Sequence, residues 1–167
     1  LVNAPSVAEA SATDRQLPIY GVQRDQKMLA ISFDAAWGNE DTQQLIDILG
    51  KYNVKATFFV VGDWVDKYPE SVKALHDAGH EVMNHSNSHA HMSQLSSEAI
   101  VADVEACNDK IEAVTGVRPT LIRPPYGEYD NNVITSIRSI GMEPIQWDVD
   151  SLDWKDLPAG EITERVV

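Results

Sequence analysis

Cysteine, long apolar runs and positive charge are all scarce in this 167-residue sequence, and each shortage excludes a class of protein. Cys107 is the single cysteine, so no disulfide can form within the chain, and its helical context favours a small core residue. No run within these residues is apolar enough for a secretion signal or a membrane span. The formal net charge of −13 argues against nucleic acid or an anionic membrane as a partner, and is compatible with an extracellular setting or an uncharged polymer.

The length fits one domain with a sizeable core, preceded by a segment of different composition. Residues 2–15 are rich in Ala, with two Ser and one Asn, and have no sustained hydrophobic period. We therefore interpret residues 1–26 as an N-terminal tail or linker and residues 27–167 as the domain. Because the sequence begins at Leu1 rather than Met, we expect a processed or engineered N-terminus, with a removed segment that anchored the protein to a membrane.

Strand-like and helix-like patterns alternate five times along the domain. Helices are expected between the strands, as where Ser96 caps a long segment with apolar residues at helical spacing before Gly116. A further helix is expected to begin at Pro158. The alternation predicts an α/β fold with a parallel sheet and right-handed crossovers, either an open doubly wound sheet or part of a barrel. The five strands are expected at residues 28–33, 55–61, 80–84, 121–123 and 143–147.

Polar residues of catalytic type follow the carboxyl ends of these strands, where loops from distant parts of a parallel sheet converge. Each has an ordinary alternative as a turn cap, a surface ion pair or a core ring. Their combination at successive strand ends favours a hydrolytic metal site. The residues are Asp34 after the first strand, His85 and His89 after the third, Arg123 and Tyr126 after the fourth, and Asp148, Asp150, Asp153 and Trp154 after the fifth.

Four of the five histidines lie in the short segment from His80 to Met92. The four-residue spacing of His85 and His89 lets both imidazoles bind one cation. The helical zinc motif His-Glu-x-x-His is rejected, because Glu81 follows His80 but the next histidine is one residue too far along to share a helical face. The alternative is a polar surface loop in which the histidines occur by chance.

Four motifs in order resemble the polysaccharide deacetylase family, carbohydrate esterase family 4, with its NodB homology domain. The resemblance runs from about Lys27 to the C-terminus and implies a distorted (β/α) barrel of the NodB type. It implies removal of N-acetyl groups from a chitin-like or peptidoglycan polymer, with zinc, cobalt or nickel as the metal, at an extracellular or bacterial cell-wall location. The motifs are Ser32-Phe33-Asp34, His85-Ser86-Asn87-Ser88-His89, Arg123-Pro124-Pro125-Tyr126-Gly127 and Asp150-Ser151-Leu152-Asp153-Trp154.

The resemblance also implies a role for each site residue. His85 and His89 are the metal ligands, and Asp34 is the general base that takes a proton from the attacking water. Arg123 orients Asp34 and keeps it ionised. The backbone N–H of Tyr126 stabilises the oxyanion of the tetrahedral intermediate.

The fourth and first motifs carry the remaining implications. By resemblance, Asp153 is an outer orienting residue, and Trp154 walls a small apolar pocket for the acetyl methyl group. The segment from Phe33 to Gly38, Phe-Asp-x-x-Trp-Gly, is similar to that of sporulation-type members. This similarity suggests a spore-forming bacterium and cell-wall peptidoglycan as the substrate.

The sequence departs from the family pattern at its first motif. The family has a second Asp after the general base as third metal ligand, whereas this chain has Ala35, which has no group that can bind a metal. Low metal affinity is expected as a result, since zinc prefers about four ligands. Either waters complete the shell around the two histidines, or a carboxylate such as Asp41 or Glu40 swings in as the hypothetical replacement.

The second departure is the fifth motif, a Leu-x-x-His that supplies the general acid and that lies beyond Val167 in the family pattern. His76 and His80 lie away from the expected site, and His91 is at best a weak substitute. We therefore expect a truncated chain with weak activity, because loss of a positioned acid costs about 10²–10⁴-fold in rate.

Two other classes of function are compatible with these departures. One is a catalytically weak or dead homologue that binds carbohydrate through the same groove. The other is a hydrolase that uses the site on an amide or ester outside sugars. Acetate release from N-acetylglucosamine oligomers by the complete chain, abolished by Asp34→Asn, would distinguish an amidase from a binding protein.

Overall fold

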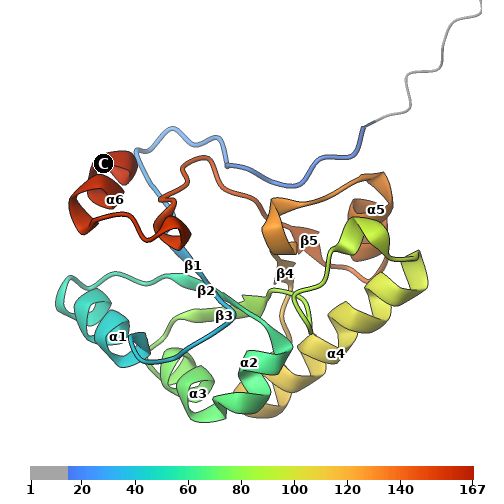
Figure 1. The fold of residues 1–167 in the computed structure, drawn as a ribbon, viewed down its shortest axis with the longest axis horizontal. Coiled ribbons are helices and arrows are strands. Elements are labelled where there is room, and N and C mark those ends of the chain that lie inside the picture. Colours follow the sequence, from blue (N-terminus) through green and yellow to red (C-terminus); the bar gives the residue numbers. More distant parts are fainter. Residues whose placement is uncertain (1–14) are drawn as a thin grey trace, which may run out of the picture.

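The computed structural model describes residues 15–167, which form a parallel sheet with helices packed against it (Figure 1). The sheet order follows the chain order, so β1 and β5 are its two edges. The α/β class is confirmed. The strands are β1 (Ser32–Ala35), β2 (Thr57–Val60), β3 (Glu81–Asn84), β4 (Leu121–Ile122) and β5 (Glu143–Pro144). The α-helices are α1 (Thr42–Lys51), α2 (Gly62–Lys67), α3 (Pro69–Asp77), α4 (Ser97–Thr115), α5 (Asn131–Ser139) and α6 (Ala159–Val166), and the short 3₁₀ helices are η1 (Met92–Gln94), η2 (Pro125–Gly127) and η3 (Asp153–Lys155).

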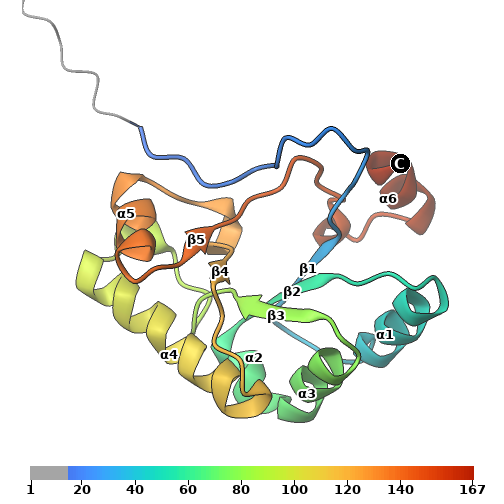
Figure 2. The same cartoon turned by 180° about the vertical axis from the view of Figure 1, so that it is seen from behind.

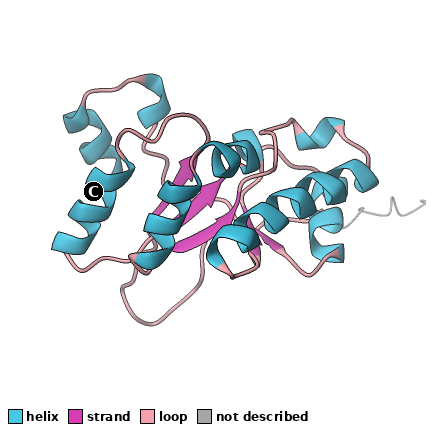
Figure 3. Ribbon diagram, turned by 90° about the horizontal axis from the view of Figure 1, so that it is seen from below, coloured by secondary structure: helices cyan, strands magenta, loops and turns pink. Residues whose placement is uncertain are grey.

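The helices α1 to α4 lie together on one side of the molecule. Figures 1 and 2, which view the molecule from opposite directions, both place these helices below the strands and the N-terminal described segment above them. In the view from below, several helices accordingly lie in front of the strands (Figure 3). Among residues 15–167, no helix has the length and apolar character needed to cross a membrane.

Two clusters of buried side chains form the core. The larger cluster joins β2 and β3 to helices α1 to α4 through residues such as Phe58, Trp64 and Leu75. The second joins β4 to α4 and α5, with Ile122 and Ile137 fully buried. Because α4 contributes to both clusters, this helix fixes the loops after β3 and β4 relative to each other.

The predicted helix ends are borne out where a side chain or a glycine marks them. The Ser96 hydroxyl accepts a hydrogen bond from the N–H of Ala99 at 3.2 Å, which caps α4. That helix ends at Gly116, whose φ of 74° lies in the left-handed region that favours glycine. The helix expected from Pro158 is also present as α6.

The first strand differs from its prediction. We expected a buried strand at residues 28–33, but β1 begins at Ser32, and Met28 and Leu29 are 65% and 82% exposed. The ladder begins where Ser32 pairs with Thr57 of β2. Within the described residues no strand pairs with the other side of β1, so the preceding apolar residues have no partner to bury them.

Part of the predicted tail is bound to the sheet. Ile19 pairs in parallel with Ile145: its N–H donates to the carbonyl of Pro144 at 2.9 Å, and its carbonyl accepts from the N–H of Gln146 at 2.7 Å. Arg138 of α5 donates to the Leu17 carbonyl at 3.1 Å. The tail character expected of residues 1–14 lies outside the described residues, whereas Ile19 adds an isolated parallel bridge next to β5.

Candidate active site

Asp34, the expected general base, lies in β1 and is held by Arg123, the residue that follows β4. The Nη1 of Arg123 donates to Asp34 Oδ1 at 2.7 Å. The carboxylate side chain is 36% exposed, whereas that of Arg123 is only 6% exposed. Asp34 therefore has one oxygen fixed by a buried cation and a surface open to water, as a base that acts on water requires.

Arg123 is itself fixed from several sides. Its Nη2 donates to the Ser32 hydroxyl at 2.9 Å and to the Gln146 carbonyl at 3.1 Å. The guanidinium carbon lies 4.2 Å from the ring centroid of Phe59 and 5.4 Å from that of Trp147. A planar cation with directed donors and flat apolar faces suits this environment, which a lysine could not reproduce.

His85, the first expected ligand, follows β3 and is 3% exposed. Its Nδ1 lies 2.6 Å from the backbone carbonyl of Arg123. A carbonyl can only accept, so Nδ1 carries the proton and the lone pair is on Nε2, which lies 3.8 Å from Asp34 Oδ2. Burial lowers the pKa of His85, with the Asp34 carboxylate opposing that effect, so the ring is a neutral donor suited to a cation.

His89, the second expected ligand, lies beside His85 with their ring centroids 5.0 Å apart. Burial, and secondly the neighbouring His85, lower the pKa of His89. Among the described residues, the buried Nδ1 of His89 has no hydrogen-bond partner. A buried nitrogen without a partner is unusual in a folded protein and fits a site that receives another group.

The loop that carries the two histidines is held by residues that the sequence did not single out. The Asn84 side chain donates to the Val104 carbonyl at 2.9 Å and accepts from the Ser86 N–H at 2.7 Å. Asp103 of α4 accepts from the N–H of Asn87 at 2.8 Å. These contacts fix a loop in which both Ser86 and His89 have positive φ. The signal available beforehand was only a polar residue at the end of a buried strand.

Tyr126 also has a left-handed backbone, with a φ of 60° inside η2. Its ring centroid lies 4.6 Å from that of His89. The following residue, Gly127, has a φ of 63°, and a Cβ there would lie 2.7 Å from the Trp147 ring. The turn thus needs glycine at one position and a left-handed tyrosine at the other.

A divalent cation would find two protein donors here. Among residues 15–167, no group of three or more His, Cys, Asp or Glu side chains is arranged to hold a metal ion. His85 and His89 fit a cation as neutral imidazoles, and Ala35 adds nothing. Water or substrate would fill the remaining positions.

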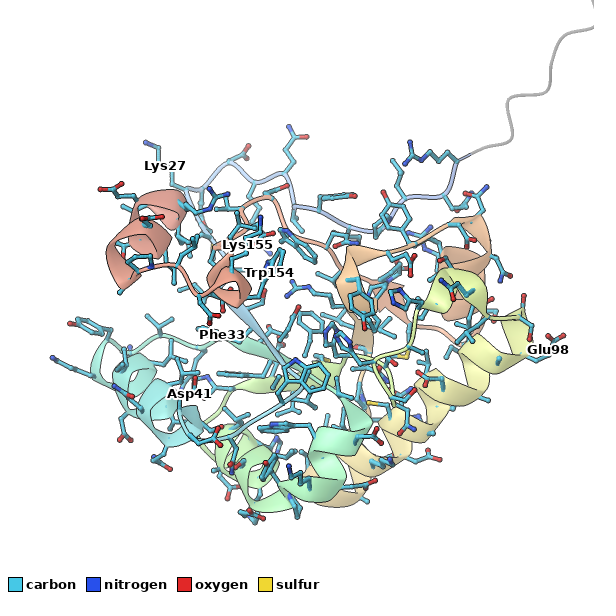
Figure 4. The ribbon with its side chains drawn as sticks, viewed as in Figure 1. Lys27, Phe33, Asp41, Glu98, Trp154 and Lys155 are labelled. Atoms are coloured by element: carbon cyan, nitrogen blue, oxygen red, sulfur yellow. The ribbon has the colours of Figure 1, made fainter. Side chains whose placement is uncertain are left out.

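The replacement ligands expected from the sequence do not join the histidines. Glu40 folds its carboxylate back over Gly38, so that a Cβ on that glycine would collide with it. Asp41 occupies the N-cap position of α1, where Figure 4 labels it. Neither belongs to a three-residue ligand group within the described chain as the side chains stand, so a replacement ligand from Glu40 or Asp41 would need its carboxylate to move and stays a prediction.

The fourth motif lies at the surface. The carboxylate of Asp153 accepts from the Ser151 hydroxyl at 2.6 Å, and Trp154 is 70% exposed with the Lys155 ammonium 4.9 Å from its ring centroid. Figure 4 shows Trp154 and Lys155 together on the segment before α6. Within the described residues, no hydrogen bond or ion pair joins Asp153 to Arg123 or Asp34, so the structure assembles Asp34, His85, His89, Arg123 and Tyr126 without it.

Comparison with known families gives a match over most of the chain. The family model described as polysaccharide deacetylase matches residues 21–145. The uncharacterized protein YlxY of Bacillus subtilis is 36% identical over 150 residues, which cover 90% of this chain and 47% of YlxY. The peptidoglycan-N-acetylmuramic acid deacetylase PdaC of Bacillus subtilis is 39% identical over 146 residues, or 87% of this chain and 31% of PdaC. This chain therefore spans about half or less of the length of these curated relatives.

Solved structures give the same match. The wild-type BA3943 protein of Bacillus anthracis, described as a CE4 family pseudoenzyme, superposes with a TM-score of 0.87 at 37% identity. That match covers 90% of this chain and 53% of that one. A mutant of BA3943 described as having restored enzymatic activity also has a TM-score of 0.87, at 38% identity, and covers 90% of this chain and 55% of that one.

Proposed function

Since the chain belongs to the polysaccharide deacetylase family, we propose that it hydrolyses N-acetyl groups of the amino sugars of a polysaccharide, with a divalent metal held by His85 and His89. Zinc is the proposed metal, because imidazole nitrogens suit it. Peptidoglycan is the proposed polymer and the bacterial cell wall the proposed location, since relatives such as PdaC are named for action on peptidoglycan.

One observation carries the proposal: Asp34 Oδ1 is bound to Arg123 while Oδ2 faces the free Nε2 of His85 at 3.8 Å. The chemistry that a cation supplies when bound is polarisation of the amide carbonyl and acidification of water. Asp34 is then placed to take the proton from the attacking water. Arg123 keeps the carboxylate in a single orientation through the 2.7 Å bond.

The backbone N–H of Tyr126 is the proposed donor to the oxyanion, and the contact of the Tyr126 ring with the His89 ring at 4.6 Å puts this residue beside the proposed metal ligand. The Trp154 ring is proposed to cover the acetyl methyl group when substrate is bound, with Asp153 as an outer residue that orients the site. Both lie exposed on the segment before α6, so this part of the proposal includes closure of that segment over the glycan.

Glycan binding without turnover is the second candidate. Ala35 favours it, because the position after the general base has no carboxylate. A similar protein from Bacillus anthracis is described as a pseudoenzyme. The two candidates use the same residues and differ in whether the amide bond is cleaved.

Acetate release from N-acetylglucosamine oligomers by the zinc-loaded chain tests the proposal. Asp34→Asn should lower the rate by about 10²–10⁴-fold, the range for a positioned general base. Asp77→Asn is the matched control, because Asp77 pairs with Lys73 on the surface of α3. Oligomer binding without acetate release would instead support the binding protein.

Zinc titration tests the metal site separately. His85→Ala should weaken zinc binding, and Ala35→Asp should tighten it by adding a third ligand. Ala36→Asp is the control, since it introduces the same carboxylate one residue further along and should not tighten binding. Zinc affinity that is unchanged in His85→Ala would contradict the site.

A further inference from the structure

Four rings contact one another in a row beside the proposed metal site, and the last ring is a histidine that the proposed reaction does not use. Trp37 and His89 have ring centroids 5.8 Å apart, and His89 and Tyr126 have theirs 4.6 Å apart. His91 ends the row, and it alone stacks on its neighbour: its ring centroid lies 4.2 Å from that of Tyr126 and the two planes are only 6° from parallel. Tyr126 is therefore enclosed between the expected ligand His89 and the additional histidine His91.

Tyr126 needs such support because of its backbone. Its φ of 60° is in the left-handed region that residues with a side chain seldom adopt. Tyr126 is 58% exposed, so packing in the core does not hold its side chain in place. The backbone of the turn is held by a side chain from outside it: the Gly127 carbonyl accepts a hydrogen bond from the Gln146 side chain at 2.9 Å. The ring contacts supply the second attachment of the turn.

His91 is itself held at both ends. Its Nδ1 lies 3.1 Å from the Oε2 of Glu128, two residues after Tyr126. Its backbone occupies the N-cap position of η1, whose first residue, Met92, is 1% exposed and lies in the core. The pair of His91 and Glu128 thus links the histidine loop to the η2 turn across the face of the Tyr126 ring.

We propose that His91 and Glu128 are positioning residues that clamp the Tyr126 ring and thereby fix the direction of its backbone N–H. The inference rests on the proposed deacetylase function, in which that N–H receives the oxyanion. It assigns His91 a different role from the proton donor considered from the sequence, because the ring lies flat on Tyr126 and its Nδ1 is bound to Glu128. A displacement of about 1 Å in a reacting group can cost about 10²-fold in rate, so a clamp outside the reacting atoms can govern kcat.

The variants separate the flat ring from the hydrogen bond. His91→Ala removes both, whereas His91→Phe keeps a flat ring over Tyr126 and removes the bond. Glu128→Ala removes the carboxylate, whereas Glu128→Gln keeps an oxygen that accepts from Nδ1–H. His76→Ala in α3 is the control, because it removes an imidazole that is not one of these four rings.

The first readout does not depend on activity. Ring carbon relaxation of the ¹³C-tyrosine-labelled chain, with the Tyr126 signal assigned by Tyr126→Phe, reports the order of this ring. His91→Ala and Glu128→Ala should increase its mobility, whereas Glu128→Gln and His76→Ala should leave it as in the wild type. His91→Phe should be intermediate. A Tyr126 ring that is equally ordered in His91→Ala and the wild type would overturn the clamp.

The second readout is steady-state hydrolysis of N-acetylglucosamine oligomers by the zinc-loaded chains. His91→Ala should lower kcat by about 10-fold to 100-fold with little change in KM or zinc affinity, and His91→Phe should restore part of the loss. A weakened zinc affinity with unchanged kcat at saturating zinc would overturn the clamp and indicate a role in metal binding. If the wild type itself releases no acetate, the proposed function fails, and the relaxation measurement still decides whether His91 holds Tyr126.

Discussion

Replacing Arg123 by methionine removes the cation that orients Asp34 while keeping an unbranched side chain of similar reach. The change leaves the Asp34 carboxylate and the Gln146 carbonyl without the donors that lie at 2.7 Å and 3.1 Å. It also removes the guanidinium from the face of Phe59. The apolar part of the methionine can still contact that ring, so the loss is mainly electrostatic.

The magnitude follows from the burial of the two partners. Breaking a buried ion pair by deleting one partner costs about 3–5 kcal/mol of unfolding free energy. Asp34 is 36% exposed and can recover hydration, so we expect a loss near the lower end of that range, about 3 kcal/mol. Arg123→Lys keeps the charge but cannot reach all three acceptors, and should lose about half as much.

Urea unfolding of the metal-free chain, followed by tryptophan fluorescence, measures both losses. Lys73→Met is the control, because Lys73 and Asp77 form an exposed pair whose loss should cost less than about 1 kcal/mol. A double-mutant cycle with Asp34→Asn isolates the pairwise coupling. If Arg123→Met costs no more than the control, or the coupling with Asp34→Asn is zero, the guanidinium does not hold the carboxylate and the reasoning is wrong.

Three further predictions concern the turn beside the site and two buried residues. Gly127→Ala should lower the unfolding free energy by about 1–3 kcal/mol, because the φ of Gly127 is 63° and the new Cβ would meet Trp147 at 2.7 Å. Gly50→Ala in α1 is the control and should not destabilise, because a Cβ there meets nothing within 4 Å. Equal urea midpoints for the two variants would refute this prediction. Burial, and secondly the charge of Lys55, lower the pKa of His80, whose Nδ1 accepts from the Ala56 N–H at 3.2 Å. Below about pH 6.5 the unfolded chain therefore binds more protons at His80 than the folded chain does, so the unfolding free energy should fall as the pH falls, by up to about 1.4 kcal/mol per pH unit for this residue. His80→Gln should show a shallower decline of the unfolding free energy with falling pH. Burial raises the pKa of Cys107 to about 12, so the folded chain should react with a thiol reagent at pH 8 only through unfolding, and rapid labelling of native protein would contradict its placement in the core.

The sequence predicted the order of the elements better than their extent. Apolar runs and caps placed α4 correctly, because Ser96 and Gly116 act locally on the backbone next to them. The run from Met28 to Phe33 gave too early a start for β1, because strand length is decided by partners far away in the sequence. The strand expected at residues 143–147 ends at Pro144, and the next residues pair with Ile19, which the sequence placed in a tail.

For the site, the motifs predicted which residues come together but not what holds them. Asp34, His85 and Arg123 meet because parallel strands deliver their ends to one edge. The hydrogen bond from His85 to the backbone carbonyl of Arg123 could not be predicted, because every residue has a backbone carbonyl and the sequence does not show which one accepts. The role of Asp103 was equally hidden, because an aspartate on the surface of a helix resembles many that contact only solvent.

The pairing of Ile19 with β5 matters for where a recombinant chain is begun. A gene that starts at Lys27, the boundary suggested by composition, would delete the strand-like segment that covers the N–H of Gln146 and the carbonyl of Pro144. Unpaired groups along a sheet edge are a template for pairing with another molecule. Shortened versions would therefore be expected to self-associate as their concentration rises, because the segment around Ile19 covers backbone groups that would otherwise be free to pair with another molecule.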